Sequence, residues 1–461
     1  MGVGGASPTA GASCATCLRK FTVHFRVSDY NDNRLVNGKY IKSDYDGSFG
    51  FDWLRDEYIY PIIPVDDKNK RPIFKGNPLK LISSYKAGQK SQIKPFGEQY
   101  IPSWLAMFSS VNSNQINKNG VILNLEILQC LGDDILPLAN DGTKLFFLPT
   151  TESLKVIPDT LDLSKFLQKK RKSKKLANRV RYFYEENNSI KIICNNILND
   201  HEEINVYAIK GVSQEKVGKL MVYRNNNIPK LELSFINVVT NSQSIKKPDK
   251  YEFYLKYQSF NQALIRAERR LETNFDLVFL SKSIPEIKDF LNKINSTSDL
   301  DADKISGELI NLFDKYGGKY RPNDGKNNLT INGDGHARTY IFYTNIKAGR
   351  TNGIAPDDKL WNIIPNGWGN SVVVFQQAQT NIDTLVHEIG HSLKLPHIFE
   401  FWGNDYQFYQ GQTSNIMDYT WYKTAIWNNI NKKWIIGDNK KRRKFFSKIQ
   451  WDLLRSDRSL K

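Results

Sequence analysis

An eleven-residue stretch, His387–His397, constrains this chain most, because it holds three of the six histidines among 461 residues. Its first five residues fit the pattern H-E-x-x-H. Residues four apart lie on one face of a helix, so His387 and His391 can point their rings at one metal ion. Glu388 projects from the adjacent part of that turn and can reach a metal-bound water as a general base. The stretch therefore predicts a helix that carries a metal site.

The third histidine, His397, follows His387 by ten positions and stands beyond Pro396, which disfavours a continuing helix. A chain that turns back after Leu393 would bring His397 to the same metal ion. Three imidazoles and a water form an open four-coordinate site, which is the geometry of catalytic zinc. We therefore expect one zinc ion (Zn2+) held by three histidines.

A second stretch, Ser414–Tyr419, contains Met417, one of only four methionines in the chain. Together the two stretches resemble the metzincin clan of zinc peptidases, whose pattern is H-E-x-x-H-x-x-G-x-x-H followed by a methionine turn. The resemblance implies that Glu388 is the general base and that Met417 forms an apolar floor beneath the metal. It also implies that Tyr419 binds zinc or steadies the transition state. The zinc ligands that it implies are His387, His391 and His397.

One position departs from the clan, because Lys394 stands where the clan has glycine. Glycine serves there because the helix ends in a left-handed conformation, which costs other residues about 1–2 kcal/mol. Either Lys394 tolerates that strain or the turn after the helix differs.

The remaining candidates have simpler interpretations. We interpret His24, His201 and His336 as structural residues, because a lone histidine is more often structural than a ligand. Glu400 and Asp418 are competing carboxylate ligands, but neither has the spacing of the pattern. Met417 alone would be ordinary core, and Tyr419 stays open between a role in the site and packing.

The net charge is +17, and basic residues cluster in two runs, 169–175 and 440–444. Such runs are typical of solvated surface, and the alternative is attraction to acidic partners. No nucleic-acid motif accompanies them. Cys14 and Cys17 form C-x-x-C in a Gly/Ala/Ser-rich leader without a second pair, so we interpret the leader as a mobile tail.

Composition shifts predict a flexible leader (1–19), a β-rich N-terminal domain (20–150), a β-sandwich-like domain (151–245) and a zinc metallopeptidase catalytic domain (246–461). The fold class expected is α+β, with a zincin-like (metzincin) domain at the C-terminus. No catalytic cluster lies in 1–245, so we expect that part to be dispensable for chemistry and needed for delivery or targeting.

Periodicity predicts the elements within these domains. Phe21, Val23 and Phe25 alternate with polar residues as in a half-buried strand. The basic run 169–175 is expected in a loop of the second unit or before it. Helices are expected after Ser259, with apolar residues to Leu271 on one face, and over 305–316. In the metzincin clan the strand before the metal helix is a sheet edge that pairs with extended substrate, which assigns Ser371–Phe375 to the cleft. Other strands expected are 121–127, 145–148, 190–193, 204–209, 219–223, 231–235 and 340–344.

We expect a zinc-dependent endopeptidase that hydrolyses protein or peptide substrates. The layout also resembles zinc-peptidase effectors of bacterial contractile injection systems of the type VI kind, which implies a secreted toxin with secretion-apparatus partners. No apolar run of 18 residues and no secretory signal occurs. The implied route is injection into a target cell from the producer's cytoplasm, without a signal peptide. The alternatives are a catalytically inert zincin-fold binding or loading component and a charge-driven nucleic-acid-associated protein.

Overall fold

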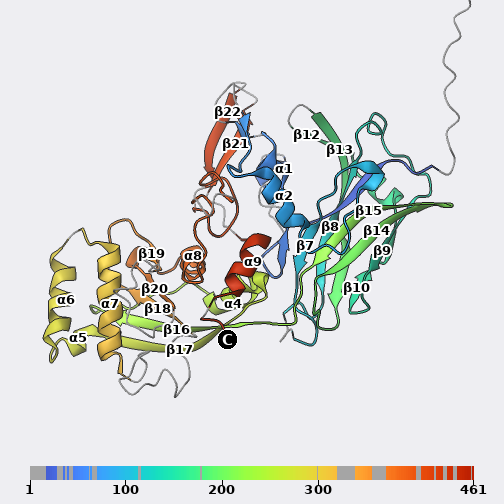
Figure 1. The fold of residues 1–461 in the computed structure, drawn as a ribbon. Helices are drawn as coiled ribbons and strands as arrows, with labels where there is room; N and C mark the ends of the chain where they lie inside the picture. Colours follow the sequence, from blue (N-terminus) through green and yellow to red (C-terminus); the bar gives the residue numbers. More distant parts are fainter. Residues whose placement is uncertain are drawn as a thin grey trace, which may run out of the picture.

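The computed structural model describes residues 17–27, 35–36, 39–40, 45–61, 63–64, 70–112, 116–176, 179–297, 299–318, 338–355, 370–400, 406–419, 422–428, 433–439, 444–457 and 459–461. Most of the leader expected at 1–19, His336 and most of the basic run 440–444 lie outside these residues. Helices and sheets are both present, so the α+β class is confirmed at that level (Figure 1). Among the described helices, none is long and apolar enough to cross a membrane.

The first of two large sheets has eleven described strands. Its main path runs β10-β13-β8-β1-β15-β14-β9-β11, while β12 pairs with β13, and β7 pairs with both β15 and β4. On β1, Phe21, Val23 and Phe25 are fully buried on one face, as their alternation predicts. The strands are β1 (Phe21–Arg26), β4 (Gly50–Asp52), β7 (Ser103–Ala106), β8 (Val121–Gln129), β9 (Lys144–Pro149), β10 (Leu154–Ile157), β11 (Thr160–Asp162), β12 (Lys172–Leu176), β13 (Arg179–Cys194), β14 (Glu202–Lys210) and β15 (Ser213–Val222).

This sheet does not divide at residue 150, where two β-rich units were expected to meet. Strand β9 pairs with both β14 and β11, and β13 pairs with β8, so both expected units lie in one sheet. The basic run also differs from the expected loop, because Lys172–Leu176 forms β12 and pairs antiparallel with β13. Pairing between strands that are distant in sequence decides the first feature, and pairing with the next strand along the chain decides the second. Local composition does not record either partner.

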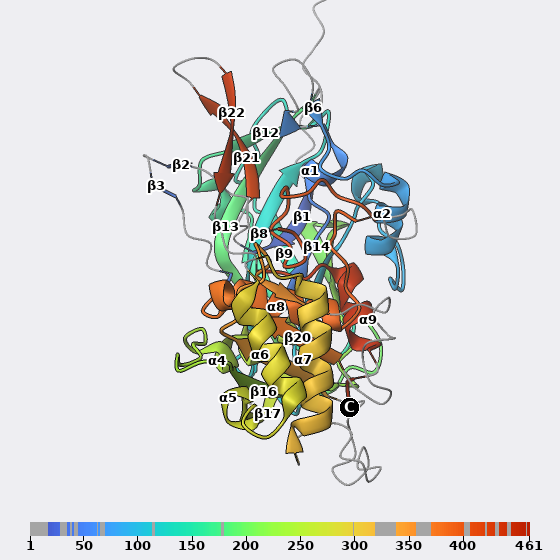
Figure 2. The same cartoon turned by 90° about the vertical axis from the view of Figure 1, so that its left-hand side faces the viewer.

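The second sheet runs β17-β16-β18-β20-β19, with only the β19–β20 pair antiparallel. Its strands are β16 (Lys230–Val239), β17 (Arg266–Asp276), β18 (Thr339–Thr344), β19 (Gly353–Ile354) and β20 (Asn370–Val374). One face of this sheet is covered by the helices α5 (Leu277–Leu280), α6 (Pro285–Ser296) and α7 (Ala302–Tyr316). Figure 2 shows α6 and α7 lying over the sheet. Helix α8 (Ile382–Ser392) packs on the other face.

Three expectations about this half need correction. Strand β16 lies between β17 and β18, so the expected domain boundary at 245 falls after a strand of the C-terminal sheet. The helix expected after Ser259 is instead a short 3-10 turn (η2, Phe260–Ala263) followed by β17, because parallel pairing with β16 along its whole length overrides helix propensity. Strand β20 is not an edge, because among the described strands β19 covers it.

The helix expected over 305–316 is confirmed as α7. The Asp301 side chain accepts a hydrogen bond from the Lys304 amide at its start. Gly317 and Gly318 follow its last residue, and Gly318 has a φ of 60°. Its apolar stripe, from Ile305 to Phe313, is buried against β16 and β18.

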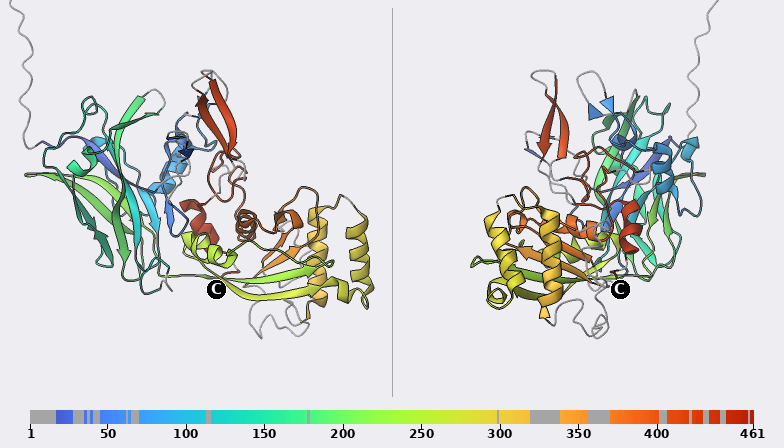
Figure 3. Two further views of the ribbon diagram at one scale, coloured as in Figure 1. Left: turned by 180° about the vertical axis from the view of Figure 1, so that it is seen from behind. Right: turned by 60° about the vertical axis from the view of Figure 1, so that its left-hand side comes forward.

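The two sheets lie at opposite ends of the molecule, with α4, α9 and the α1–α2 region between them (Figure 3). One hydrophobic core joins the halves, because it includes Tyr58, Leu81 and Trp104 as well as Leu385 and Trp451. The remaining elements are β2 (Leu35–Val36), β3 (Lys39–Tyr40), α1 (Asp56–Ile59), β5 (Ile63–Pro64), β6 (Lys70–Arg71), α2 (Pro78–Lys86), η1 (Pro95–Gly97), α3 (Ser164–Leu167), α4 (Tyr251–Tyr257), η5 (Gln376–Ala378), β21 (Tyr422–Asn428), β22 (Lys433–Asn439) and α9 (Lys448–Arg455).

Candidate metal centre

Helix α8 begins at a side-chain cap and buries one face. The Asn381 side chain accepts hydrogen bonds from the backbone amides of Asp383 and Thr384, at 2.9 and 3.2 Å. This arrangement satisfies amides that have no partner within the helix. Leu385 and Ile389 are fully buried in the core shared with β20, which leaves the two histidines of the helix on another face.

The helix ends in the left-handed turn that a glycine usually makes, and here Lys394 makes it with a φ of 67°. The Lys394 amide donates to the carbonyl of His391 at 2.8 Å, and the Leu395 amide donates to the carbonyl of Gly390 at 3.0 Å. These two bonds are the pair that defines a Schellman end. Of the two alternatives that the sequence left open, the structure has the turn with Lys394 in the strained conformation.

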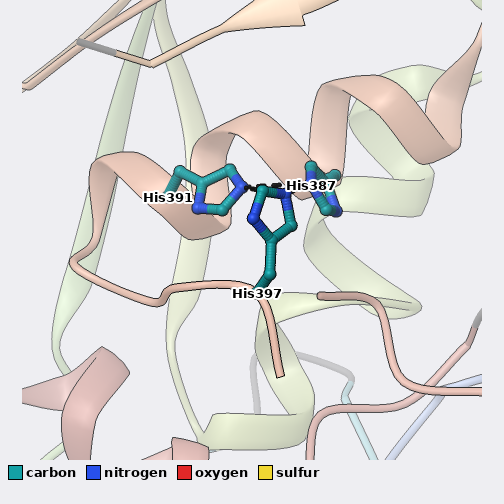
Figure 4. A group of neighbouring side chains, drawn as sticks. All are labelled: His387, His391 and His397. Carbon is teal, nitrogen blue, oxygen red and sulfur yellow. Dashed lines mark hydrogen bonds between the residues drawn. The ribbon is translucent and has the colours of Figure 1, made fainter. Parts of the chain in front are cut away.

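This turn brings His397 back against the helix, and the three Nε2 atoms converge (Figure 4). The Nε2 atom of His387 lies 3.0 Å from that of His391 and 3.2 Å from that of His397. The third separation, between His391 and His397, is 3.1 Å. Nitrogen ligands about 2.0–2.1 Å from one ion in tetrahedral geometry lie about 3.3 Å apart, so these spacings fit a shared metal ion.

The other nitrogen of each ring is held by an oxygen that can only accept. His387 Nδ1 lies 2.8 Å from the carbonyl oxygen of Ile416, and His391 Nδ1 lies 2.7 Å from that of Leu395. His397 Nδ1 lies 2.7 Å from Oε1 of Glu400. Each Nδ1 therefore carries a proton and donates it, so in the neutral ring Nε2 carries the lone pair.

Three lone pairs that face one another repel unless a cation lies between them. The histidines also have the partners on their outer nitrogens that metal-binding imidazoles have in proteins. The group His387, His391 and His397 can therefore hold a metal ion. A set of three imidazoles suits zinc, copper, iron or nickel, and it does not by itself select one of them.

Met417 packs against α8 and is fully buried. Its sulfur packs where Gly390 leaves the surface of α8 open, because a Cβ at residue 390 would stand 2.6 Å from the Met417 sulfur. The turn that carries Met417 is held by its neighbours: Asn415 Oδ1 accepts from the Met417 amide, and both carboxylate oxygens of Asp418 accept from amides at 411 and 413.

Glu388 lies on α8 beside the first ligand and is almost wholly buried. It packs against the edge strand β19, where a Cβ at Gly353 would stand 2.8 Å from Cγ of Glu388. The Tyr419 ring centre lies 5.0 Å from that of His397, and 37% of Tyr419 is exposed. Burial raises the pKa of the Tyr419 phenol, and the negative charges of Glu400 and Glu388 raise it further.

The structure places the other candidates away from the metal position. Asp418 holds its own turn, and Glu400 contacts the outer nitrogen of His397, a role that sequence reasoning missed although the three-residue spacing permits it. His24 stacks on Tyr100, and His201 packs between aromatic rings, so both have structural surroundings in the first sheet.

An apolar pocket lies beside the His397 loop. Tyr58, Leu81 and Tyr85 of the N-terminal half line one wall. Leu395–Ile398 lines the other. The third ligand therefore stands at a boundary between the two halves of the molecule.

No protein-family model matches the sequence, and a comparison with curated proteins found no match.

Proposed function

We propose that this protein is a zinc-dependent endopeptidase with a metzincin-like catalytic domain, in which His387, His391 and His397 hold Zn2+. One observation carries the proposal: three Nε2 atoms lie within 3.0–3.2 Å of one another while every Nδ1 is tied to an oxygen acceptor. A zinc ion bound there supplies a Lewis acid for the scissile carbonyl and lowers the pKa of a water.

The residues around the metal position have the chemistry that peptide hydrolysis needs. Glu388 accepts the proton of the attacking water and passes it to the leaving nitrogen. Its side chain is buried against Gly353, and it follows His387 directly on the same helix. Tyr419, whose ring centre lies 5.0 Å from that of His397 and which is partly exposed, donates a hydrogen bond to the developing oxyanion.

Substrate binding belongs to β19 in this proposal, in place of the expected Ser371–Phe375 segment. Strand β19 is one of the two outermost described strands of the sheet and stands next to Glu388 and Thr384 of α8. An extended peptide that adds to this edge gains backbone hydrogen bonds with modest sequence preference.

The resemblance in layout extends the proposal to a biological role. We propose a bacterial effector of the type VI kind, carried from the producer's cytoplasm to its target without a signal peptide. The long β-sheet half that precedes the metal half would serve contacts with a delivery apparatus. A pull-down with apparatus components tests this role separately from the chemistry.

Metal analysis of the purified full chain combined with a peptide-library cleavage assay tests the proposed activity. We expect about one zinc per chain and cleavage that a chelator abolishes. Glu388→Gln is the matched variant, because it keeps side-chain size and all three ligands while removing the base. It should keep zinc and lose nearly all turnover. A wild-type chain without bound zinc, or a Glu388→Gln variant that cleaves at the wild-type rate, would refute the proposal.

A further inference from the structure

The third ligand is supported differently from the first two. His387 and His391 stand on a hydrogen-bonded helix, whereas His397 stands on the loop that follows it. The next residue, Ile398, is held on both sides of its backbone. Its amide donates to the carbonyl of Met417 at 3.2 Å, and its carbonyl accepts from the amide of Phe408 at 2.9 Å.

The backbone hydrogen bonds continue from Phe408 into the N-terminal half of the chain and form a ladder that joins residues 73–75 to residues 407–409. Phe408 forms an antiparallel bridge with Phe74. The Tyr409 amide donates to the carbonyl of Ile73 at 3.0 Å, and the Lys75 amide donates to the carbonyl of Gln407 at 2.7 Å. Residues 73–75 act here as a strand laid against residues 407–409, although more than 300 positions of sequence separate them.

The N-terminal side of the ladder is itself anchored. Two amides donate to carbonyls of α1: that of Ile73 to residue 57 at 2.8 Å, and that of Phe74 to residue 58 at 3.2 Å. The Phe408 ring lies edge-on to two nearly buried rings, with centres 5.0 Å from Phe74 and 4.9 Å from Tyr58. The Arg71 guanidinium lies 3.3 Å from the centre of the Tyr409 ring.

We propose that residues 70–75 are a positioning element for the metal centre: they fix residues 407–409, which fix Ile398 and with it His397. This inference rests on the proposed metal centre and adds the regulation of that site by the N-terminal half. The Ile398 amide is held separately by the Met417 carbonyl, so the ladder supports the carbonyl side of this residue. When residues 70–75 detach from residues 407–409, His387 and His391 stay in place on α8, and His397 is no longer held in a fixed position.

Zinc affinity of the full chain, measured by chelator competition, tests this inference. Phe74→Ala removes the ring that packs on Phe408, and Phe74→Leu keeps most of the buried apolar volume. Phe275→Ala is the matched control, because Phe275 is equally buried but packs on α7 at the opposite face of the second sheet. Loss of an outer support typically weakens metal binding by about 10–100-fold. We expect about tenfold weaker binding for Phe74→Ala, recovery in Phe74→Leu and wild-type affinity in Phe275→Ala.

A double variant separates positioning from general destabilisation. In a His397→Ala background the third ligand is absent, so Phe74→Ala should cause no further loss of zinc affinity. The inference fails if Phe74→Ala binds zinc like the wild type, or if it weakens binding equally in both backgrounds.

Amide hydrogen exchange on the metal-free chain distinguishes this inference from the proposed activity. Phe74→Ala should speed exchange at Ile398 and Phe408 while residues 385–391 of α8 stay protected. Unchanged exchange at Ile398 would overturn the inference even in an active zinc peptidase. If Phe74→Ala speeds exchange at Ile398 and Phe408 but the wild-type chain binds no zinc, the positioning role of residues 70–75 is supported and the proposed function is refuted.

Discussion

Gly390 and Met417 form a matched pair under the three histidines: the missing side chain of one makes room for the sulfur of the other. A Cβ at residue 390 would stand 2.6 Å from the Met417 sulfur and 3.4 Å from its terminal methyl. Glycine within a helix costs roughly 1 kcal/mol relative to alanine, so this position gives up helix propensity to let the Met417 sulfur pack close to α8.

Gly390→Ala should therefore destabilise the chain although alanine favours helices. Overpacking of a buried contact costs about 1–3 kcal/mol, which outweighs the gain in propensity. We expect a lower thermal midpoint together with weaker zinc binding, because α8 carries two ligands. Thermal unfolding with and without zinc measures both.

A second substitution provides the control. Gly390→Ala combined with Met417→Ala removes the clash, so the double variant should lose less than the sum of the two single losses. Additive losses would mean that the two residues are not in the contact described here.

The grouping of the three histidines was predictable because their relationship is local. His387 and His391 share a helix face by their spacing alone, and the turn to His397 follows from the end of that helix. By contrast, β17 has the composition of a helix and becomes a strand only because β16 offers it a partner. No pattern within Arg266–Asp276 records that partner.

The division of the chain was misjudged for the same reason. Strand β16 looks like the last strand of a β-rich unit, yet it lies between β17 and β18 of the metal half. The ladder from Ile73 to Tyr409 joins segments that have no local relationship in the sequence. Side-chain alternation predicts which face of a strand is buried, and it says nothing of the strand beside it.

The expectation that residues 1–245 are dispensable for chemistry changes accordingly. A chain of residues 246–461 lacks β16 and the N-terminal half of the shared core, including Tyr85 and Trp104. It also lacks Asp52, whose buried carboxylate accepts from the Lys448 amide at the start of α9. We expect this fragment to be insoluble or unfolded by circular dichroism, whereas the full chain unfolds cooperatively. A soluble 246–461 fragment with a cooperative transition would contradict the shared core.

His201 should make stability depend on pH in a window below neutrality. Burial, assisted by the positive charges of Arg224 and Lys448, lowers the pKa of His201 to about 4, against an ordinary value of 6.5; Asp452 and Asp200 oppose this. Between pH 6.5 and 4 the unfolded chain binds a proton at this residue that the folded chain does not. Stability is therefore highest above pH 6.5 and falls as the pH drops through the window.

Urea unfolding at several pH values measures this dependence. His201→Gln removes the titrating group, so the variant should lose less stability than the wild type between pH 6.5 and 4. Burial also lowers the pKa of His24, so the free energy of unfolding of the variant should still fall with falling pH, with a smaller slope. Equal slopes in both proteins would show that His201 does not stay neutral in the folded chain.

Lys394→Gly should stabilise the end of the metal helix. Lys394 has a φ of 67°, which costs a residue with a Cβ about 1–2 kcal/mol and costs glycine almost nothing. Glycine also gains freedom in the unfolded chain, which returns part of that advantage, so we expect a net stabilisation of up to about 1 kcal/mol. The two backbone bonds of the turn involve no side chain of residue 394, so zinc affinity should be equal or higher. Lys394→Ala is the control, because it keeps the Cβ and the strain and should change the midpoint little. A clear drop in the midpoint of Lys394→Gly with weaker zinc binding would contradict the left-handed turn, and with it the path that brings His397 to the other two histidines.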